Sequence, residues 1–276
     1  ILKGIVVFFS KNYPEFLVLE VGADQIGDIK SLVRWLSPNV VILTQFAPVP
    51  VHIENFNNDR ELLVKEKEYL AIAATDMLIY NGDDIDCQRI SKRAGALNAD
   101  LHRVSFGRGL HNTLILRDAG NSYDLHSAIG TLEYDHRLYK VSIDEALGQA
   151  TIVSVMPGIL ASIYLNGNEK GNVLDTINDT VKRLNKMERQ PGRMHPLYGI
   201  KNTLIIDDTY NSSPKALENG LETLREIGTK YRRIAVLADM KELGHRSEEE
   251  HYRVGRIIPS SANVLITYGK ESKHIA

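Results

Sequence analysis

The hydrophobic pattern of the first part of the chain alternates between strand-like and helix-like stretches. Three short apolar runs, each bounded by turn residues, predict buried strands at Phe16–Val21, Val40–Thr44 and Met77–Tyr80. Between the last two strands, Asp59 is a suitable N-cap for a helix that runs to about Ala74. This spacing of strands and helices indicates an α/β fold with a mostly parallel, doubly wound sheet.

The pattern changes between about Leu101 and Ile143. Short strand-like segments, NTLILRD and LYKVSI, are separated there by turn residues such as Ala119-Gly120-Asn121. We expect a small antiparallel β insertion in this region. Helical periodicity returns over residues 174–184.

The segment Gln190-Pro191-Gly192-Arg193 has the composition of a linker. We therefore place a domain boundary near residue 188, between a first domain of residues 1–188 and a second of residues 189–276. The second domain opens with a strand at 204–206 that ends at Asp207. A helix follows, with Ser213 as N-cap and Pro214 at its first position.

Two further strands are predicted in the second domain, at Ile234–Leu237 and Val264–Tyr268. Ser247 and Glu250 have the spacing of a capping box at the start of the helix between them. A Rossmann-like α/β domain is the expected architecture.

Composition narrows the possible functions. The 276 residues are 43% hydrophobic and 25% charged, with a net charge of −2, which is typical of a soluble globular protein. The charges are dispersed, so no nucleic-acid partner is expected. No apolar run approaches the ~20 residues of a membrane helix, so no membrane association is expected. A single cysteine, Cys87, favours the cytoplasm, and the start at Ile1 without methionine suggests a piece of a longer protein.

Two residues follow successive strands of the predicted sheet. Glu20 lies near the carboxyl end of its strand, where an acid commonly holds Mg²⁺, although a solvent-facing acid is equally expected there. His52 follows the next strand and reaches the same edge if the sheet is parallel. By itself such a histidine is more often a hydrogen-bonding surface residue than a ligand.

The helix from Asp59 carries charged residues within its apolar stripe. Glu66 and Lys67 fall inside that stripe at 100° per residue, whereas Lys65 falls outside it. A buried lysine is costly unless it is neutralised or paired. The alternative is that Glu66 and Lys67 lie at the edge of the helix with their charged ends in solvent.

Three polar segments have the composition of ligand sites. Asn81-Gly82-Asp83-Asp84 ends a strand, and its Asn amide suits a base edge, although Asn-Gly is also a common turn. Arg193 offers a guanidinium to phosphate or ribose, or is a surface residue of the linker. DDTYNSS, residues 207–213, lies between a strand end and a helix start, where anions bind; an ordinary β–α connection is the alternative.

Taken together, these segments resemble the Mur ligase family of ATP-dependent ligases that build the peptide of peptidoglycan. Matching segments run from VLEVGAD (18–24) through VHIENF (51–56), EK (66–67), NGDD (81–84) and PGRM (191–194) to DDTYNSSP (207–214) and LADMKELG (237–244). DDTYNSSP followed by DMKELG is specific at this spacing, whereas the other segments are individually weak.

The resemblance implies ATP and Mg²⁺ as cofactors and a reaction through an acyl phosphate. It implies that Glu20, His52 and a carbamylated Lys67 form the catalytic, metal-facing set. It implies that Asn81 meets the adenine and that the second domain faces the nucleotide through Arg193, Asp208 and Asn211. The implied substrates are a UDP-linked muramoyl peptide and a dipeptide or amino acid; the oligomeric state is not indicated.

Several positions depart from the family pattern. The family's P-loop, G-x-x-G-K-[ST], is expected before residue 1, as is the substrate-binding N-terminal domain. Thr44-Gln45-Phe46-Ala47 stands where the family has T-N-x-G, and Ala150, Thr151 and Ser154 stand where G-x-H-N-x-x-N has His and two Asn. Two alternatives stay open: a relative of folylpolyglutamate or cyanophycin synthetases, and a non-catalytic nucleotide-binding paralogue.

Overall fold

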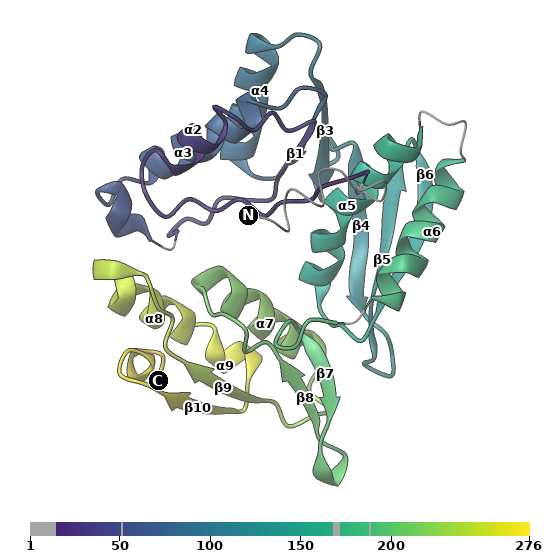
Figure 1. The fold of residues 1–276 in the computed structure, drawn as a ribbon. Helices are drawn as coiled ribbons and strands as arrows, with labels where there is room; N and C mark the ends of the chain where they lie inside the picture. The colour runs from purple at the N-terminus through teal and green to yellow at the C-terminus, as the bar shows by residue number, and fades with distance from the viewer. Residues whose placement is uncertain (1–14, 51, 168–171, 188) are drawn as a thin grey trace, which may run out of the picture.

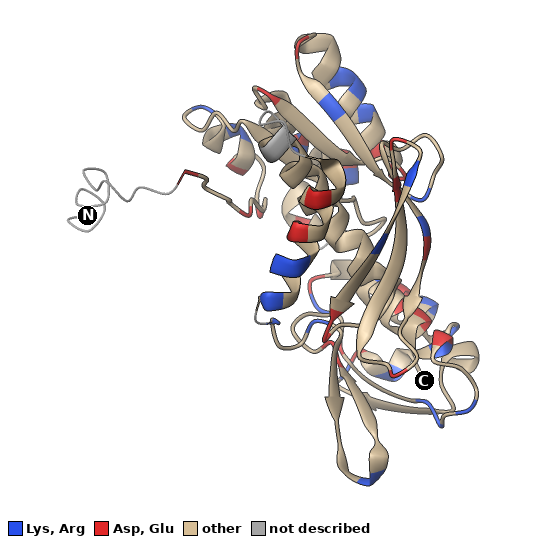
Figure 2. Cartoon of the chain, turned by 90° about the vertical axis from the view of Figure 1, so that its right-hand side faces the viewer, with Lys and Arg blue, Asp and Glu red and all other residues tan. Residues whose placement is uncertain are grey.

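A computed structural model describes residues 15–50, 52–167, 172–187 and 189–276. The chain forms two parts, an upper one up to residue 187 and a lower one from residue 189 (Figure 1). Residue 188, at the predicted domain boundary, lies outside the described residues. Positively and negatively charged residues are interspersed along both parts (Figure 2).

Within the described residues of the first part, six strands form one sheet in the order β1-β2-β3-β4-β5-β6. They are β1 (Val40–Leu43), β2 (Met77–Asn81), β3 (His102–Gly107), β4 (Leu114–Asn121), β5 (Ser127–Tyr134) and β6 (Arg137–Asp144). The pairings from β1 to β4 are parallel, and those from β4 to β6 are antiparallel. The predicted fold class, a mostly parallel sheet with a small antiparallel addition, is confirmed.

Helices cover both faces of this sheet. Met77 and Ile79 of β2 pack into a core with residues of α5 (Gln149–Gly167) and α6 (Val173–Lys186). Leu78, which points to the opposite face, packs into a second core. That second core includes residues of α2, α3 and α4, with bounds Asp28–Leu32, Arg60–Ile72 and Ile85–Leu97. Burial on both faces explains the continuous apolar sequence of β2.

The second part contains two small sheets and a layer of helices. β7 (His195–Tyr198) pairs antiparallel with β8 (Leu204–Asp207), and β9 (Ile234–Ala238) pairs parallel with β10 (Val264–Tyr268). The helices are α7 (Pro214–Glu226), α8 (Ser247–Gly255) and α9 (Ile258–Ser261), with short 3₁₀ turns at Ile200–Asn202, Gly244–Arg246 and Ser272–His274. These helices pack on β9 and β10 through a third hydrophobic core.

Two of the three predicted helix N-caps are confirmed. Asp59 caps α3 by accepting the Glu61 N–H at 2.8 Å, and Ser213 caps α7 by accepting the Ala216 N–H at 3.3 Å, both as predicted. The predicted capping box is wrong, because Ser247 is already helical and makes no cap hydrogen bond. A 3₁₀ turn leads directly into α8 and replaces the capped entry.

The strand predicted at Phe16–Val21 is not formed among the described residues. Phe16, Leu17, Val18 and Leu19 are between 51% and 92% exposed, and none of them pairs with β1. Apolar periodicity shows that a segment is suited to a sheet but does not supply a partner strand. No helix in the described part of the chain is long and apolar enough to span a membrane.

The two parts meet at two separate places. Near α5, the Leu147 N–H donates to the Met194 carbonyl at 3.1 Å. At the other place, the loop after β1, which contains the 3₁₀ turn η1 (Ile53–Phe56), packs on residues 240–244. Val49 from this loop is 7% exposed and belongs to the hydrophobic core of the second part.

Candidate functional site

The turn after β2 is built by its own side chains. Asn81 is 9% exposed, and its Oδ1 accepts the Asp83 N–H at 2.9 Å, which is the hydrogen bond of an Asx turn. The Gly82 N–H donates to Phe106 O of β3 at 2.9 Å. A Cβ on Gly82 would lie 1.9 Å from Oδ1 of Asn112, so any larger residue would displace the Asn112 side chain. Asn81 therefore forms the turn that was the alternative to a ligand site. A role of Asn81 toward adenine stays a prediction.

Asp83 holds the neighbouring loop after β3 in place. Its carboxylate accepts the backbone N–H groups of Arg108 at 2.5 Å and Gly109 at 2.9 Å, and Nδ2 of Asn112 at 2.9 Å. Partial burial opposes ionisation, but these three donors outweigh it, so the pKa of Asp83 lies below its usual value. His111 contacts Gly82 O through Nε2 at 2.8 Å. No sequence pattern identifies His111 or Asn112, because both act through contacts with a distant turn.

Asp84 connects three segments of the first part. As N-cap of α4, its Oδ1 accepts the N–H groups of Asp86 at 2.9 Å and Cys87 at 3.0 Å. Its Oδ2 accepts the Phe46 N–H at 2.7 Å. One carboxylate therefore fixes both the start of α4 and the loop after β1.

Lys67 points inward from α3, toward that same loop. It is half-buried, with Nζ 5.5 Å from the centroid of the Phe46 ring, whereas Lys65 is exposed. Burial lowers the pKa of Lys67, and the nearby Cys87 partly opposes that shift. Glu66 does not pair with Lys67; it is 3% exposed and accepts the Lys30 N–H at 2.9 Å. The inward direction of Lys67 agrees with the helical-angle argument.

His52 lies between the two parts of the chain. Its Nε2 is 3.8 Å from Oδ1 of Asp24 and 3.4 Å from Oε2 of Glu242, and its backbone N–H donates to Glu242 O at 3.3 Å. Its φ of 60° is left-handed, a conformation that tertiary contacts must hold in a non-glycine residue. Sequence reasoning identified His52 but missed both acids beside it.

Glu20 is exposed and lies in the unpaired segment before Asp24. Among the described residues, no group of three or more His, Cys, Asp or Glu side chains gathers in a way that could hold a metal ion. His52 lies beside Asp24 and Glu242. Among the described residues it makes no direct contact with Glu20 or Lys67.

In the second part, Asp207 and Asp208 hold the linker against the end of β8. Asp207 accepts the Gly192 N–H at 3.1 Å, and Asp208 accepts the Met194 N–H at 3.2 Å. Gly192 has a φ of 76°, and a Cβ there would lie 2.6 Å from the Tyr210 nitrogen. The linker glycine is therefore needed for this close approach.

Arg193 and Asp208 place two charged side chains where the linker meets the end of β8. The Arg193 guanidinium stacks over the Tyr210 ring at 4.2 Å. Burial raises the pKa of Asp208, and the Met194 hydrogen bond and the charge of Arg193 only partly offset it. Asn211 is exposed in the same loop, where its Oδ1 accepts the Ser212 N–H at 2.8 Å. The three residues predicted to face a nucleotide lie within one loop and the linker bound to it.

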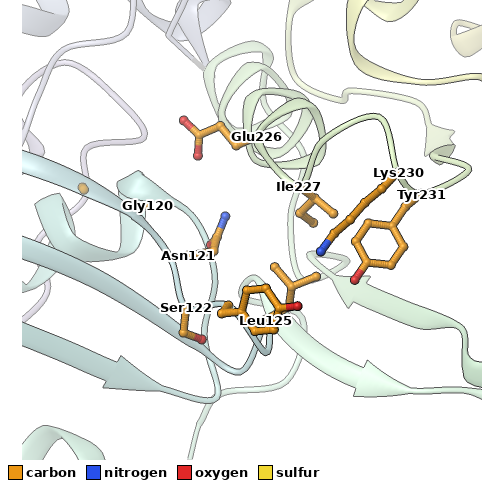
Figure 3. Close-up of a pocket in the computed structure, with 10 residues that line it drawn as sticks. Gly120, Asn121, Ser122, Leu125, Glu226, Ile227, Lys230 and Tyr231 are labelled. Carbon is orange, nitrogen blue, oxygen red and sulfur yellow. The ribbon is translucent and has the colours of Figure 1, made fainter.

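The start of α5, where Ala150, Thr151 and Ser154 replace the expected motif, also touches the second part. Gln149 hydrogen-bonds to Arg108 of the first part and to Glu226 of α7. Beside this contact, a pocket of about 430 Å³ lies between the β4–β5 turn and the end of α7 (Figure 3). Nζ of Lys230 lies 5.1 Å from the Tyr123 ring and 5.0 Å from the Tyr231 ring at its wall.

The sequence of the second part matches a known protein family. Residues 192–276 match the family profile described as Mur ligase, glutamate ligase domain. The second part of the chain is therefore similar to a Mur ligase domain. The resemblance predicted from the sequence motifs is confirmed, and Arg193, Asp208 and Asn211 lie inside the matched Mur ligase domain.

Relatives match the chain beyond that domain. The UDP-N-acetylmuramoyl-tripeptide–D-alanyl-D-alanine ligase of Haemophilus influenzae is 25% identical over 95% of this chain and 53% of its own length. The ligase of the same name from Bacillus subtilis is 24% identical over 99% of this chain and 55% of its own length. The segments DDTYNSSP and DMKELG predicted a resemblance to this ligase, and these matches confirm it. The chain spans about half the length of these relatives.

Solved structures share the fold of this chain. The MurF ligase from Thermotoga maritima in complex with ADP matches with a TM-score of 0.75 and 24% identity, over 95% of this chain and 56% of that one. MurF from Acinetobacter baumannii matches with a TM-score of 0.79 and 20% identity, over 96% and 54%. Both matches extend across the two parts seen in Figure 1.

Proposed function

We propose that this chain is part of an ATP-dependent carboxylate–amine ligase that acts in peptidoglycan precursor synthesis through an acyl phosphate. The observation that carries the proposal is the similarity of 95% and 99% of the chain to two ligases named for that substrate. Its substrates would then be a UDP-linked muramoyl peptide and a dipeptide or amino acid, in the cytoplasm.

The junction around Asp208 supports a nucleotide site. Arg193 is fixed on Tyr210, so its guanidinium is oriented for a phosphate or ribose. Asp208 is partly buried and accepts one hydrogen bond within the described residues, which leaves further acceptor capacity for a ligand. We assign Arg193, Asp208 and Asn211 to the nucleotide from the second part, and Asn81 to the adenine from the first.

Lys67 is suited to carbamylation. The reaction forms a bond between neutral Nζ and the carbon of CO₂ and releases one proton, so it needs the unprotonated amine. Burial lowers the pKa of Lys67 and increases that fraction. The product is an anion with two oxygens, which are ligands of the kind that Mg²⁺ prefers.

A Mg²⁺ site composed of Glu20, His52 and Lys67 remains a proposal. The carboxylate of Glu20 and a carbamylated Lys67 would offer oxygens, which suit the ion, whereas His52 offers a nitrogen. These side chains do not converge among the described residues, and Glu20 is exposed. The residues that place His52 are Asp24 and Glu242.

The first test concerns ligation itself. The 276-residue chain should release no phosphate from ATP with Mg²⁺, a UDP-muramoyl peptide and a dipeptide, because it contains no P-loop sequence to cradle the β- and γ-phosphates. A longer parent protein with a P-loop should turn over under the same conditions. The loss of one such donor typically costs ~10²–10³ in rate, and here the whole cradle is missing. Turnover by the chain near the parent's rate would show that the phosphate site is misplaced.

The second test separates Lys67 from Lys65. In the parent, Lys67→Ala should lose ligation by about 10²-fold or more, because a group that orients charge near the phosphates is removed. Short carboxylic acids should partly restore it. Lys65→Ala is the matched control on the exposed face and should behave like the wild type. Equal, near-normal rates for both variants would remove Lys67 from the mechanism.

The main rival is a nucleotide-binding paralogue that does not ligate. Ala150, Thr151 and Ser154, which replace a histidine and two asparagines, favour it. A parent that binds ADP but releases no phosphate with any carboxylate and amine pair would establish this alternative. Turnover with folate and glutamate instead of a muramoyl peptide would establish the synthetase relative.

A further inference from the structure

A second pocket, of about 260 Å³, lies where the loop after β1 packs on the second part. Its apolar wall includes Val49 and Ile53, both buried. Asn58 and Arg60 line it from the first part of the chain, and His245 and Arg246 line it from the second. Polar side chains of both parts therefore face one small space with an apolar side.

The polar lining is rich in hydrogen-bond donors. Within the described residues, the side chains of Asn58 and His245 have no hydrogen-bond or ion-pair partner. Arg60 uses Nε toward Ala47 O and Nη2 toward Asp86, and Arg246 uses Nε toward Glu249 at 3.3 Å. Each guanidinium has five N–H groups, so both arginines keep donors for a further acceptor.

The lining residues include no aspartate or glutamate. The acid that pairs with each arginine lies outside the lining of the pocket. Asp86 is also 3.0 Å from Arg89, and Glu249 is three residues further along α8 than Arg246. The pocket thus presents two arginines with unused N–H donors, each paired with one acid outside the lining, and unused amide and imidazole groups.

We propose that this pocket binds a small oxyanion, a carboxylate or a phosphate group on a compact apolar body. Guanidinium groups bind both oxyanions through paired N–H donors, which is the chemistry that Arg60 and Arg246 offer together. Val49 and Ile53 provide the apolar contact. Because Arg60 and Arg246 belong to different parts, a bound oxyanion bridges them and stabilises their contact.

This site is separate from the proposed nucleotide site. The residues assigned to the nucleotide, Arg193, Asp208 and Asn211, do not line the pocket. The proposal also does not depend on ligation, so a chain that never turns over ATP still tests it.

The test is an NMR titration of the isotopically labelled 276-residue chain with inorganic phosphate and, separately, with acetate. The expected result is a saturable shift of the Asn58, His245 and Arg246 signals with at least one of the two. Shifts with both identify a general oxyanion site, and shifts with one identify the phosphate or the carboxylate as the preferred group.

Variants decide whether the pocket is responsible. Arg246→Gln should weaken the binding about tenfold or more, because a charge-assisted hydrogen bond is removed. Arg225→Gln is the matched control: Arg225 also pairs with a glutamate three residues away, Glu222 at 3.1 Å, but does not line the pocket. It should bind like the wild type.

Asn58→Asp supplies a second variant that keeps the local shape and adds a negative charge. Aspartate tolerates the φ of 57° at this position, so the fold should persist while binding is lost. The proposal is overturned if neither phosphate nor acetate shifts the signals of Asn58, His245 and Arg246. It is also overturned if Arg246→Gln or Asn58→Asp gives the spectrum of a folded protein and binds the anion as tightly as the wild type.

Discussion

Two aspartate pairs, each at the carboxyl end of a strand, differ in how fully they are hydrogen-bonded. At the end of β2, Asp83 and Asp84 each accept three hydrogen bonds from described residues. At the end of β8, Asp207 accepts the Gly192 N–H and two donors of Thr209, whereas Asp208 accepts only the Met194 N–H within the described residues. The same dipeptide is saturated in one place and has a free acceptor in the other.

This difference separates structural from ligand-binding carboxylates. A carboxylate that already accepts three N–H donors has little capacity left for a substrate, and its removal leaves those donors unpaired. Asp208 is partly desolvated without full compensation, a condition that is common at binding sites. The hydrogen bonds of each pair, rather than its sequence, therefore predict which pair meets a ligand.

The largest expected effect comes from Asp84→Ala. The variant loses the cap of α4 and leaves the Phe46 N–H without its acceptor. Together these losses should lower the free energy of unfolding by about 2–4 kcal/mol. Urea denaturation followed by circular dichroism measures this change.

Asp59→Ala is the control for Asp84→Ala. Asp59 also caps a helix, but its side chain accepts a single hydrogen bond, from the Glu61 N–H. Its loss should cost about 1 kcal/mol. Equal losses for the two variants would mean that the hydrogen bond donated by the Phe46 N–H to Asp84 contributes nothing, and the contrast between the two aspartate pairs would weaken.

The sequence predicted those features whose causes are local. Ser213 and Asp59 were recognised as caps because a cap depends on residues within one turn. The inward direction of Lys67 followed from helical geometry alone. The cap predicted at Ser247 failed because the preceding residues, Gly244–Arg246, form a 3₁₀ turn that no capping pattern reveals.

Features that depend on contacts between distant segments could not be predicted from local sequence patterns. The segment Phe16–Val21 has the apolar pattern of a strand, yet pairing requires a neighbour that the pattern does not specify. The two acids beside His52, Asp24 and Glu242, come from opposite parts of the chain. Only the folded arrangement brings them together, so the surroundings of His52 were invisible in the sequence.

A smaller effect is expected for Asp208→Asn. If Asp208 is a ligand-binding acceptor, the variant in the longer parent should bind ADP about tenfold more weakly, because a charged acceptor is lost. The free energy of unfolding should change little. Calorimetric titration with ADP measures the affinity. Asp207→Asn is the control that should destabilise the linker instead, since Asp207 accepts the Gly192 N–H.

The smallest effect is a pH dependence of opposite sign for Asp83 and Asp208. Hydrogen bonds hold the pKa of Asp83 below its unfolded value of about 3.9, so its stabilising contribution is present above that pH and is lost as the pH falls through the folded pKa. Burial raises the pKa of Asp208, so the folded state binds more protons than the unfolded state above about pH 3.9. Ionised Asp208 therefore costs stability as the pH rises through that window. Relative to Asp83→Asn, the wild type should lose stability on acidification; relative to Asp208→Asn, it should gain stability. Urea denaturation over a pH series measures both differences, and slopes of the same sign would refute the contrast between a saturated and an under-satisfied carboxylate.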